Sequence, residues 1–216
     1  MSVIYFIFQQ TMLFTIPLMI VALGGMFSER SGVVNIALEG IMTMGAFTGI
    51  LFLNMTGGRM SRQMQLLLAI LISTGTGAVF AFFHAYASIN MKANQTISGT
   101  ALNMFAPAFA IFVARVIQGV QQIQFNNTFR IESVPLLGSI PFFGPLLFQN
   151  TYITTYLGIA ILILSTLVLY RTRFGLRLRS CGEHPQAADA AGINVCRMQY
   201  AGVLISGVLG DRKSVV

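Results

Sequence analysis

The sequence contains no tryptophan, only two cysteines, and charged residues at only 9% of its 216 positions. A soluble globular domain carries about 25% charged residues, so an ordinary soluble protein is excluded. Two cysteines are too few for a disulfide-stabilised secreted scaffold. A hydrophobic content of 55%, with 18 Phe and 12 Met, excludes a disordered chain or a coiled coil. Together with a mean hydropathy of +0.75, the composition predicts an integral membrane protein.

The sequence also lacks the short motifs of the common catalytic sites. It has no HExxH, GxSxG or CxxC pattern, and its two histidines, His84 and His184, are far apart, which favours a packed or interfacial role for His84. No Gly-Lys dipeptide occurs, so the chain has no Walker-type phosphate loop. We therefore expect a protein that is not an enzyme and binds no cofactor itself. If it pumps, another subunit supplies the energy.

Acidic residues are scarce, with 6 Asp and Glu against 13 Lys and Arg, which gives a net charge of +7. Such an excess is typical of nucleic-acid-binding proteins. More than half of the basic residues, however, lie in short segments between long apolar runs, where membrane orientation explains them better. No nucleic-acid partner is expected.

Five apolar runs are long enough to cross a bilayer, which requires about 20 residues of helix. They are Val3–Phe27, Val33–Asn54, Leu66–Ile89, Thr96–Gly119 and Tyr152–Tyr170. A sixth run begins near Met198 and is still apolar at Leu209, which is too short to span. The sequence predicts an all-α, polytopic helical transmembrane protein with five complete spanning helices and a truncated sixth.

Basic residues near the ends of these runs predict that the N-terminus lies outside. Seven of them then lie in inner segments: Arg30, Lys92, Arg171, Arg173, Arg177, Arg179 and Arg197. Three lie outside: Arg59, Arg62 and Arg130. Both cysteines fall in an inner segment, where thiols stay reduced, so no disulfide is expected. The segment 120–150 contains three prolines and is expected to be an outer loop with short interfacial elements.

Polar side chains in the second and fourth runs are candidates for a translocation pathway. Asn35 and Glu39 are four residues apart and would share one face of a helix. An ionised Glu inside a bilayer is costly, so it normally faces protein or water. In the fourth run, Gly99 and Asn103 lie on a polar helix face beside Ser98, and amides and hydroxyls of this kind suit a polar uncharged solute. For both groups, hydrogen bonding that locks helix packing is the alternative.

The segment 171–197 breaks the apolar pattern for about 27 residues and carries five of the 13 basic residues. Pro185 suits the first turn of a helix, Gln186–Ala191 are mostly strong helix formers, and Gly192 is placed to end the helix. An Ala-rich helix of two turns has little area to fold on alone, so we expect it to lie in a groove of a partner. A solvated, positively charged inner loop is the alternative.

Three sequence blocks carry a resemblance to a known family. They are residues 28–42 (SERSGVVNIALEGIM), residues 93–103 (ANQTISGTALN), and residues 172–195, in which TRFGLRLR is followed by GEHPQAADAAGINV. In combination they resemble the permease subunits of ATP-binding-cassette (ABC) importers, in the branch that contains branched-chain amino acid, ribose and nucleoside transporters. Within that branch they are most similar to the nucleoside permeases.

The resemblance implies a permease that translocates a nucleoside or similar small polar solute across the cytoplasmic membrane. Two permease subunits, often non-identical, would enclose the path, an external lipoprotein would deliver solute, and a cytoplasmic ATPase would bind ATP and Mg. The residues that couple to the ATPase would be Glu183, His184, Pro185, Gln186, Ala187, Ala188, Asp189, Ala190, Ala191 and Gly192. The pathway residues would be Asn35, Glu39, Ser98, Gly99 and Asn103.

The chain departs from the family pattern after Ser206-Gly207, where family members continue with further spanning helices. We therefore expect one incomplete permease domain over residues 1–209 and a non-native tail at residues 210–216. An ion-coupled secondary transporter of a polar solute is one alternative, although it predicts more buried acids than Glu39 alone. A branched-chain amino acid or sugar ABC permease is another.

Overall fold

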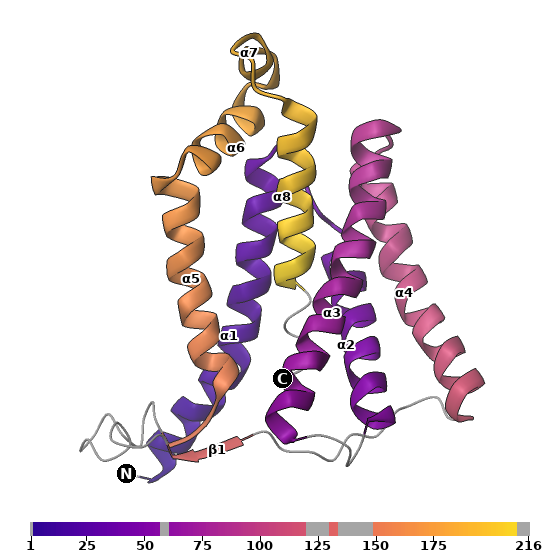
Figure 1. The fold of residues 1–216 in the computed structure, drawn as a ribbon, viewed down its shortest axis with the longest axis vertical. Helices are drawn as coiled ribbons and strands as arrows, with labels where there is room; N and C mark the ends of the chain where they lie inside the picture. The colour runs from indigo at the N-terminus through magenta and orange to yellow at the C-terminus, as the bar shows by residue number, and fades with distance from the viewer. Residues whose placement is uncertain (1, 57–60, 120–129, 134–148, 211–216) are drawn as a thin grey trace.

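The computed structural model describes residues 2–56, 61–119, 130–133 and 149–210. The helices are α1 (Ser2–Arg30), α2 (Leu38–Met55), α3 (Arg62–Ala85), η1 (Tyr86–Asn90), α4 (Gln95–Gln118), α5 (Ile153–Arg171), α6 (Arg173–Glu183), α7 (Pro185–Ala190) and α8 (Val195–Gly210). The strands are β1 (Arg130–Ser133) and β2 (Gln149–Tyr152). Figure 1 shows the long helices standing side by side, with α7 at one end of the molecule and the N-terminus at the other.

Four helical segments are long and apolar enough to cross a bilayer: Tyr5–Arg30, Leu38–Met55, Gln63–Asn90 and Gln95–Ile117. A fifth is obtained if Thr155–Arg171 and Arg173–Glu183, which meet at 70°, are counted as one span. The 16-residue α8 is apolar but shorter than these spans. The prediction of an all-α, multi-pass membrane protein is thereby confirmed.

The connection between α1 and α2 corrects one expectation, because residues 31–37 are not helical. Gly32 has a φ of +88°, a left-handed conformation that ends α1. The hydroxyl of Ser28 then donates to the carbonyl of Val33, and that of Ser31 to the carbonyl of Ser28 at 2.6 Å. Asn35 therefore precedes α2, and the expectation that Asn35 and Glu39 share one helix face is wrong.

Helix α6 was not expected from the sequence, which indicated only the short helix that follows it. Its buried positions are Gly175, Leu178 and Cys181, each three residues apart and therefore on one side of the helix. The four arginines from Arg171 to Arg179 hide this pattern when hydropathy is averaged over the whole segment. Most of residues 173–190 is thus helical, and α7 is the second of the two helices there.

Helix α8 lies against both α1 and α3 and forms the centre of the bundle, with α5 packed on the far side of α1 and with α2 and α4 beyond α3 (Figure 1). Its buried residues include Gly202, Val203, Ser206 and Gly207. A Cβ added at Gly202 would meet the side chain of Ser31. Small residues let helix backbones approach closely, which is how helices pack when water expulsion cannot drive their association.

A two-stranded antiparallel ribbon joins β1 and β2, in which Arg130 pairs with Tyr152 and Ser133 pairs with Gln149. Short elements were expected within residues 120–150, and β1 and the start of β2 are of this kind. The rest of that segment, with its three prolines, lies outside the described residues, as do residues 211–216 of the predicted tail.

The end of the molecule that carries α7 also carries the end of α1, the α3–α4 connection, α6 and the start of α8 (Figure 1). Together with Arg171 at the end of α5, these elements bear the seven basic residues assigned to the inner side. The opposite end carries the N-terminus and the β1–β2 ribbon. The seven basic residues therefore gather at one end of the bundle, as the sequence predicted, and the direction of insertion stays a prediction.

Gly207 of α8 and Gly75 of α3 provide a matched test of this packing. A Cβ at Gly207 would lie 2.8 Å from the carbonyl oxygen of Gly77 and against Ala81, whereas a Cβ at Gly75 would meet nothing within 4 Å. We expect Gly207→Ala to lower the free energy of unfolding by about 1–3 kcal/mol through overpacking. Gly75→Ala should cause no loss, because Ala favours helix by about 1 kcal/mol. Thermal unfolding in detergent measures both, and equal midpoints would contradict the packing.

Candidate functional site

Helix α7 is set by two local sequence signals, one at each end. Pro185 occupies the first helical position, where its missing N–H costs nothing. At the other end Gly192 has a φ of +79° and donates to the carbonyl of Asp189 at 2.8 Å. Ile193 donates to the carbonyl of Ala188 at 3.0 Å, which completes a Schellman motif. The predicted start and end of this helix are confirmed.

The ten residues predicted to couple to an ATPase lie together on one projection at the end of the bundle (Figure 1). Ala188 alone among them is buried, with 4% of its surface exposed, and it faces inward beneath the helix. The other nine are exposed, Ala187, Ala190 and Ala191 included. The projection therefore exposes three alanines among polar side chains, and it packs on α6 and α8.

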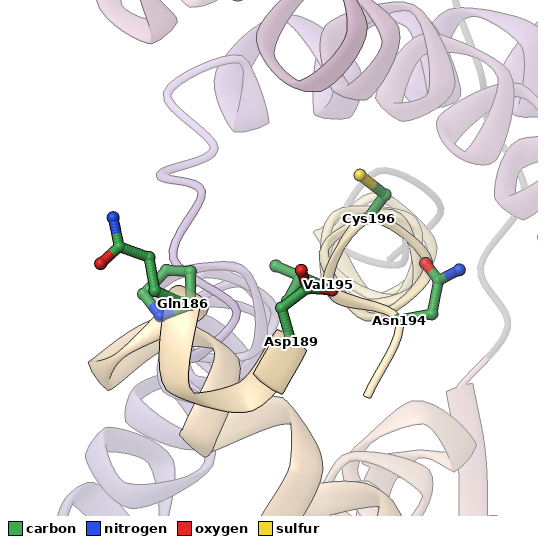
Figure 2. A pocket seen from close by; sticks show the side chains of 6 residues that line it. Gln186, Asp189, Asn194, Val195 and Cys196 are labelled. Atoms are coloured by element: carbon green, nitrogen blue, oxygen red, sulfur yellow. The ribbon is translucent and has the colours of Figure 1, made fainter. Parts of the chain in front are cut away.

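An open hollow of about 390 Å³ lies between α7 and the first turn of α8. It is lined by Pro185, Gln186, Asp189, Asn194, Val195 and Cys196. In Figure 2, Gln186 lies on one side and Asn194 and Cys196 on the other, with Asp189 and Val195 between them. Sequence reasoning missed Asn194–Cys196, although an Asn two residues after a helix-ending Gly is a typical start of the next helix.

Asn194 fixes that side of the hollow. Its side-chain oxygen accepts a hydrogen bond from the backbone N–H of Arg197 at 3.0 Å, so it caps α8. Cys196 is exposed, whereas Cys181 on α6 is buried, and that burial raises the pKa of the Cys181 thiol. A raised pKa leaves less thiolate, so Cys196 is the cysteine available to a modifying reagent.

The predicted pathway residues are brought together around the irregular segment 31–37. Asn35 is buried, donates to the hydroxyl of Ser206 on α8 at 3.0 Å, and accepts from the backbone N–H of Ala37 at 3.1 Å. The second contact is an Asx turn, a structure that Asn favours ahead of a helix. Asn35 therefore holds α8 to the start of α2.

Asn103 of α4 makes a second connection to the same segment. Its side-chain oxygen accepts from the backbone N–H of Gly40 at 2.7 Å, and its amide donates to the carbonyl of Ile36 at 2.9 Å. Helix α2 has no side-chain cap of its own at Ala37, so Asn103 caps it from a neighbouring helix. Gly99 permits this approach, because a Cβ there would lie 2.7 Å from the Cβ of Ile36.

His84 of α3 is the partner of Ser98. The His84 Nδ1 lies 3.1 Å from the Ser98 hydroxyl and its Nε2 lies 3.2 Å from the carbonyl of Val34. A carbonyl only accepts, so these contacts assign the proton to Nε2 and make Ser98 the donor to Nδ1. His84 is fully buried. The expected packed histidine is found, but the sequence did not reveal its two partners, which are 14 and 50 residues away.

Glu39 differs from the other four pathway residues because it is exposed. It lies in the first turn of α2, where a carboxylate is favoured by the helix dipole. Asn35, Ser98, Gly99 and Asn103 instead form the contacts just described. Through these four residues, α3, α4 and α8 meet segment 31–37 in one polar junction. A role in solute passage stays a prediction for all five pathway residues.

The comparison with known families assigns the chain. The profile of the family described as "Branched-chain amino acid transport system / permease component" matches residues 7–210. The chain belongs to this permease family. Together with its apolar helices, this membership makes it a multi-pass protein of the cell membrane.

The permease chain is also similar to individual curated proteins, three of which follow. It is 47% identical to the nucleoside ABC transporter permease protein NupC of Lactococcus lactis over 92% of this chain and 62% of that protein. It is 44% identical to the guanosine ABC transporter permease protein NupQ of Bacillus subtilis over 97% of this chain and 66% of that protein. A putative glucose ABC transporter permease of Haloferax volcanii is 31% identical over 88% and 55%.

The permease chain thus spans less than two thirds of the length of these relatives. No solved structure matches it.

Substitution of Asn103 tests whether the polar junction holds the helices together. We expect Asn103→Leu to lower the free energy of unfolding by about 1–3 kcal/mol, because the buried N–H of Gly40 loses its acceptor and the carbonyl of Ile36 its donor. Thr100→Val is the control, because exposed Thr100 bonds only within its own helix. Thermal unfolding without solute is the measurement. Equal midpoints for both variants would remove Asn103 from the packing.

Proposed function

We propose that the chain is the permease subunit of an ABC importer that translocates a nucleoside or similar small polar solute across the cytoplasmic membrane. The observation that carries the proposal is α7, a capped six-residue helix that stands exposed at one end of a membrane-spanning bundle. A helix this short does not persist on its own in water, so it is suited to lie in a groove of a partner.

The position of α7 suits the transfer of force from an ATPase. Ala188 packs inward, while the neighbouring alanines face outward and leave room for a close-fitting groove. The helix is joined through α6 to α5 and directly to α8, which packs at the centre of the bundle against α1 and α3. A displacement of α7 therefore acts on the helices that an alternating-access cycle would move.

The proposed assembly has three kinds of partner. A cytoplasmic ATPase binds ATP and Mg and receives α7, since the sequence of this chain holds no Walker loop. A second permease subunit, homologous but not necessarily identical, completes the path. An extracytoplasmic lipoprotein delivers the solute. In this arrangement the N-terminus lies outside, and the basic end with α7 lies inside.

A nucleoside is the solute class favoured by the two relatives above 40% identity, whose names specify nucleoside and guanosine. A sugar or a branched-chain amino acid is the second candidate, because the family is described by the latter and one relative is named for glucose. An ion-coupled carrier is less well supported, because Glu39 is the one ionisable side chain among the five pathway residues and it is exposed.

Cysteine crosslinking tests the docking of α7. In a Cys196→Ser background, Ala187→Cys and Ala191→Cys should each carry a maleimide photocrosslinker that captures a cytoplasmic ABC ATPase of the source organism. Ala188→Cys should fail to label because that position is buried. Met91→Cys is the matched control, because it is 68% exposed at the same end of the molecule but lies between η1 and α4. Labelling of Ala191→Cys by an impermeant maleimide added outside intact cells would place α7 on the wrong side.

Uptake measurements test the solute. Cells that express the permease with the ATPase and lipoprotein of its importer should accumulate labelled guanosine, and unlabelled nucleosides should compete while glucose and leucine should not. Abolition of uptake by ATP depletion with the ion gradients maintained distinguishes the importer from an ion-coupled carrier. Competition by glucose or leucine instead would identify the second candidate.

A further inference from the structure

Helix α6 carries a concentration of positive charge that the transport mechanism does not use. Arg173, Arg177 and Arg179 lie on it, Arg171 ends the preceding α5, and no acidic residue occurs from position 171 to position 182. Positive charge on the inner side sets orientation in general. That rule does not require Arg173 and Arg177 to lie on one face of a helix, so their arrangement on α6 needs a separate explanation.

The direction of α6 places it along the membrane surface. It starts two residues after the end of α5 and is bent by 70° from that span. Gly175 fixes the bend, because its backbone lies against the carbonyls of Val168 and Leu169, where a Cβ would clash. The Thr172 side chain accepts from the N–H of Gly175 at 3.2 Å, so the corner is also hydrogen-bonded. A helix at this angle to a span runs close to the plane of the bilayer.

The two faces of α6 have opposite character. Gly175, Leu178 and Cys181 are buried on the inner face. On the outer face Arg173 and Arg177, four residues apart, are both exposed, and Leu176 between them exposes 63% of its surface. An exposed apolar side chain between long cationic side chains is typical of a helix at a lipid interface, where the cations reach the headgroups.

The electrostatics of this face favour a bound anion. Arg173 and Arg177 are like charges one turn apart, and Arg173 lies in the first turn of α6, where the helix dipole disfavours a cation. Arg179 lies apart from this pair, with its guanidinium 5.1 Å from the centre of the Tyr170 ring of α5. Phosphate oxygens at the outer face would offset the repulsion between Arg173 and Arg177.

We propose that the outer face of α6 binds the phosphate headgroups of anionic phospholipids, with Leu176 inserted between them at the level of the first acyl carbons. Lipid is favoured over an acidic protein partner because α6 lies at the corner of a span, while α7 projects farther from the bundle (Figure 1). The proposal requires only that the chain spans the membrane and does not rest on the transported solute or on the ATPase.

The absence of tryptophan allows a direct measurement, because Leu176→Trp introduces the only Trp in the chain. The purified variant is placed in vesicles of equal phosphatidylcholine and phosphatidylglycerol, with the acyl chains of one lipid or the other brominated. We expect brominated phosphatidylglycerol to quench the Trp at least about twofold more strongly than brominated phosphatidylcholine, since each basic residue near the surface attracts anionic lipid. Salt at about 1 M should remove the difference by screening.

A matched pair of double variants identifies the residues responsible. In the Leu176→Trp background, Arg173→Gln with Arg177→Gln should make the two lipids quench equally. Arg30→Gln with Arg197→Gln removes the same charge from exposed positions at the same end and should leave the preference intact. Equal quenching before any arginine is changed would overturn the proposal. Quenching by neither lipid would also overturn it, because the face would then lie away from the bilayer, as a protein-binding surface would.

Discussion

The structure depends on one constraint, which is that backbone outside regular helix must find its hydrogen-bond partners within the protein when it lies in a membrane bundle. Residues 31–37 are such backbone. Val34 donates to the side-chain oxygen of Gln95 at 2.9 Å and its carbonyl lies 3.2 Å from the His84 ring. Asn103 bonds the carbonyl of Ile36. Segment 31–37 is therefore tolerated because polar side chains of α3 and α4 meet its polar groups.

The same constraint explains why three separated stretches of sequence occur together. Residues 28–42 supply the irregular segment, and residues 93–103 supply Gln95, Gly99 and Asn103, which pack against it. Residues 172–195 reach it through Gly182, whose backbone lies against the carbonyl of Arg30. Each stretch has a pattern that is unusual for a spanning helix. In the fold, the three stretches provide hydrogen-bond partners and close packing for one another.

Sequence predicted the parts of this permease that local rules determine. Span length follows from hydropathy, and α7 follows from Pro185 and Gly192, since each signal acts within a few residues. The helix α6 was missed because arginines on its outer face obscure three inward positions. Asn35 was placed in a helix because residues 33–54 form one long, mostly apolar run. Its hydrogen-bond partner Ser206 is 171 residues away in the sequence, so no local pattern reveals it.

The contact between Gly182 and Gly32 has a mechanical consequence. An added Cβ on Gly182 would lie 3.1 Å from the backbone nitrogen of Gly32, so no side chain separates the two backbone segments there. Gly182 comes three residues before Pro185. A displacement of α7 would therefore pass to the end of α1 through backbone contact rather than be absorbed by the rearrangement of side chains.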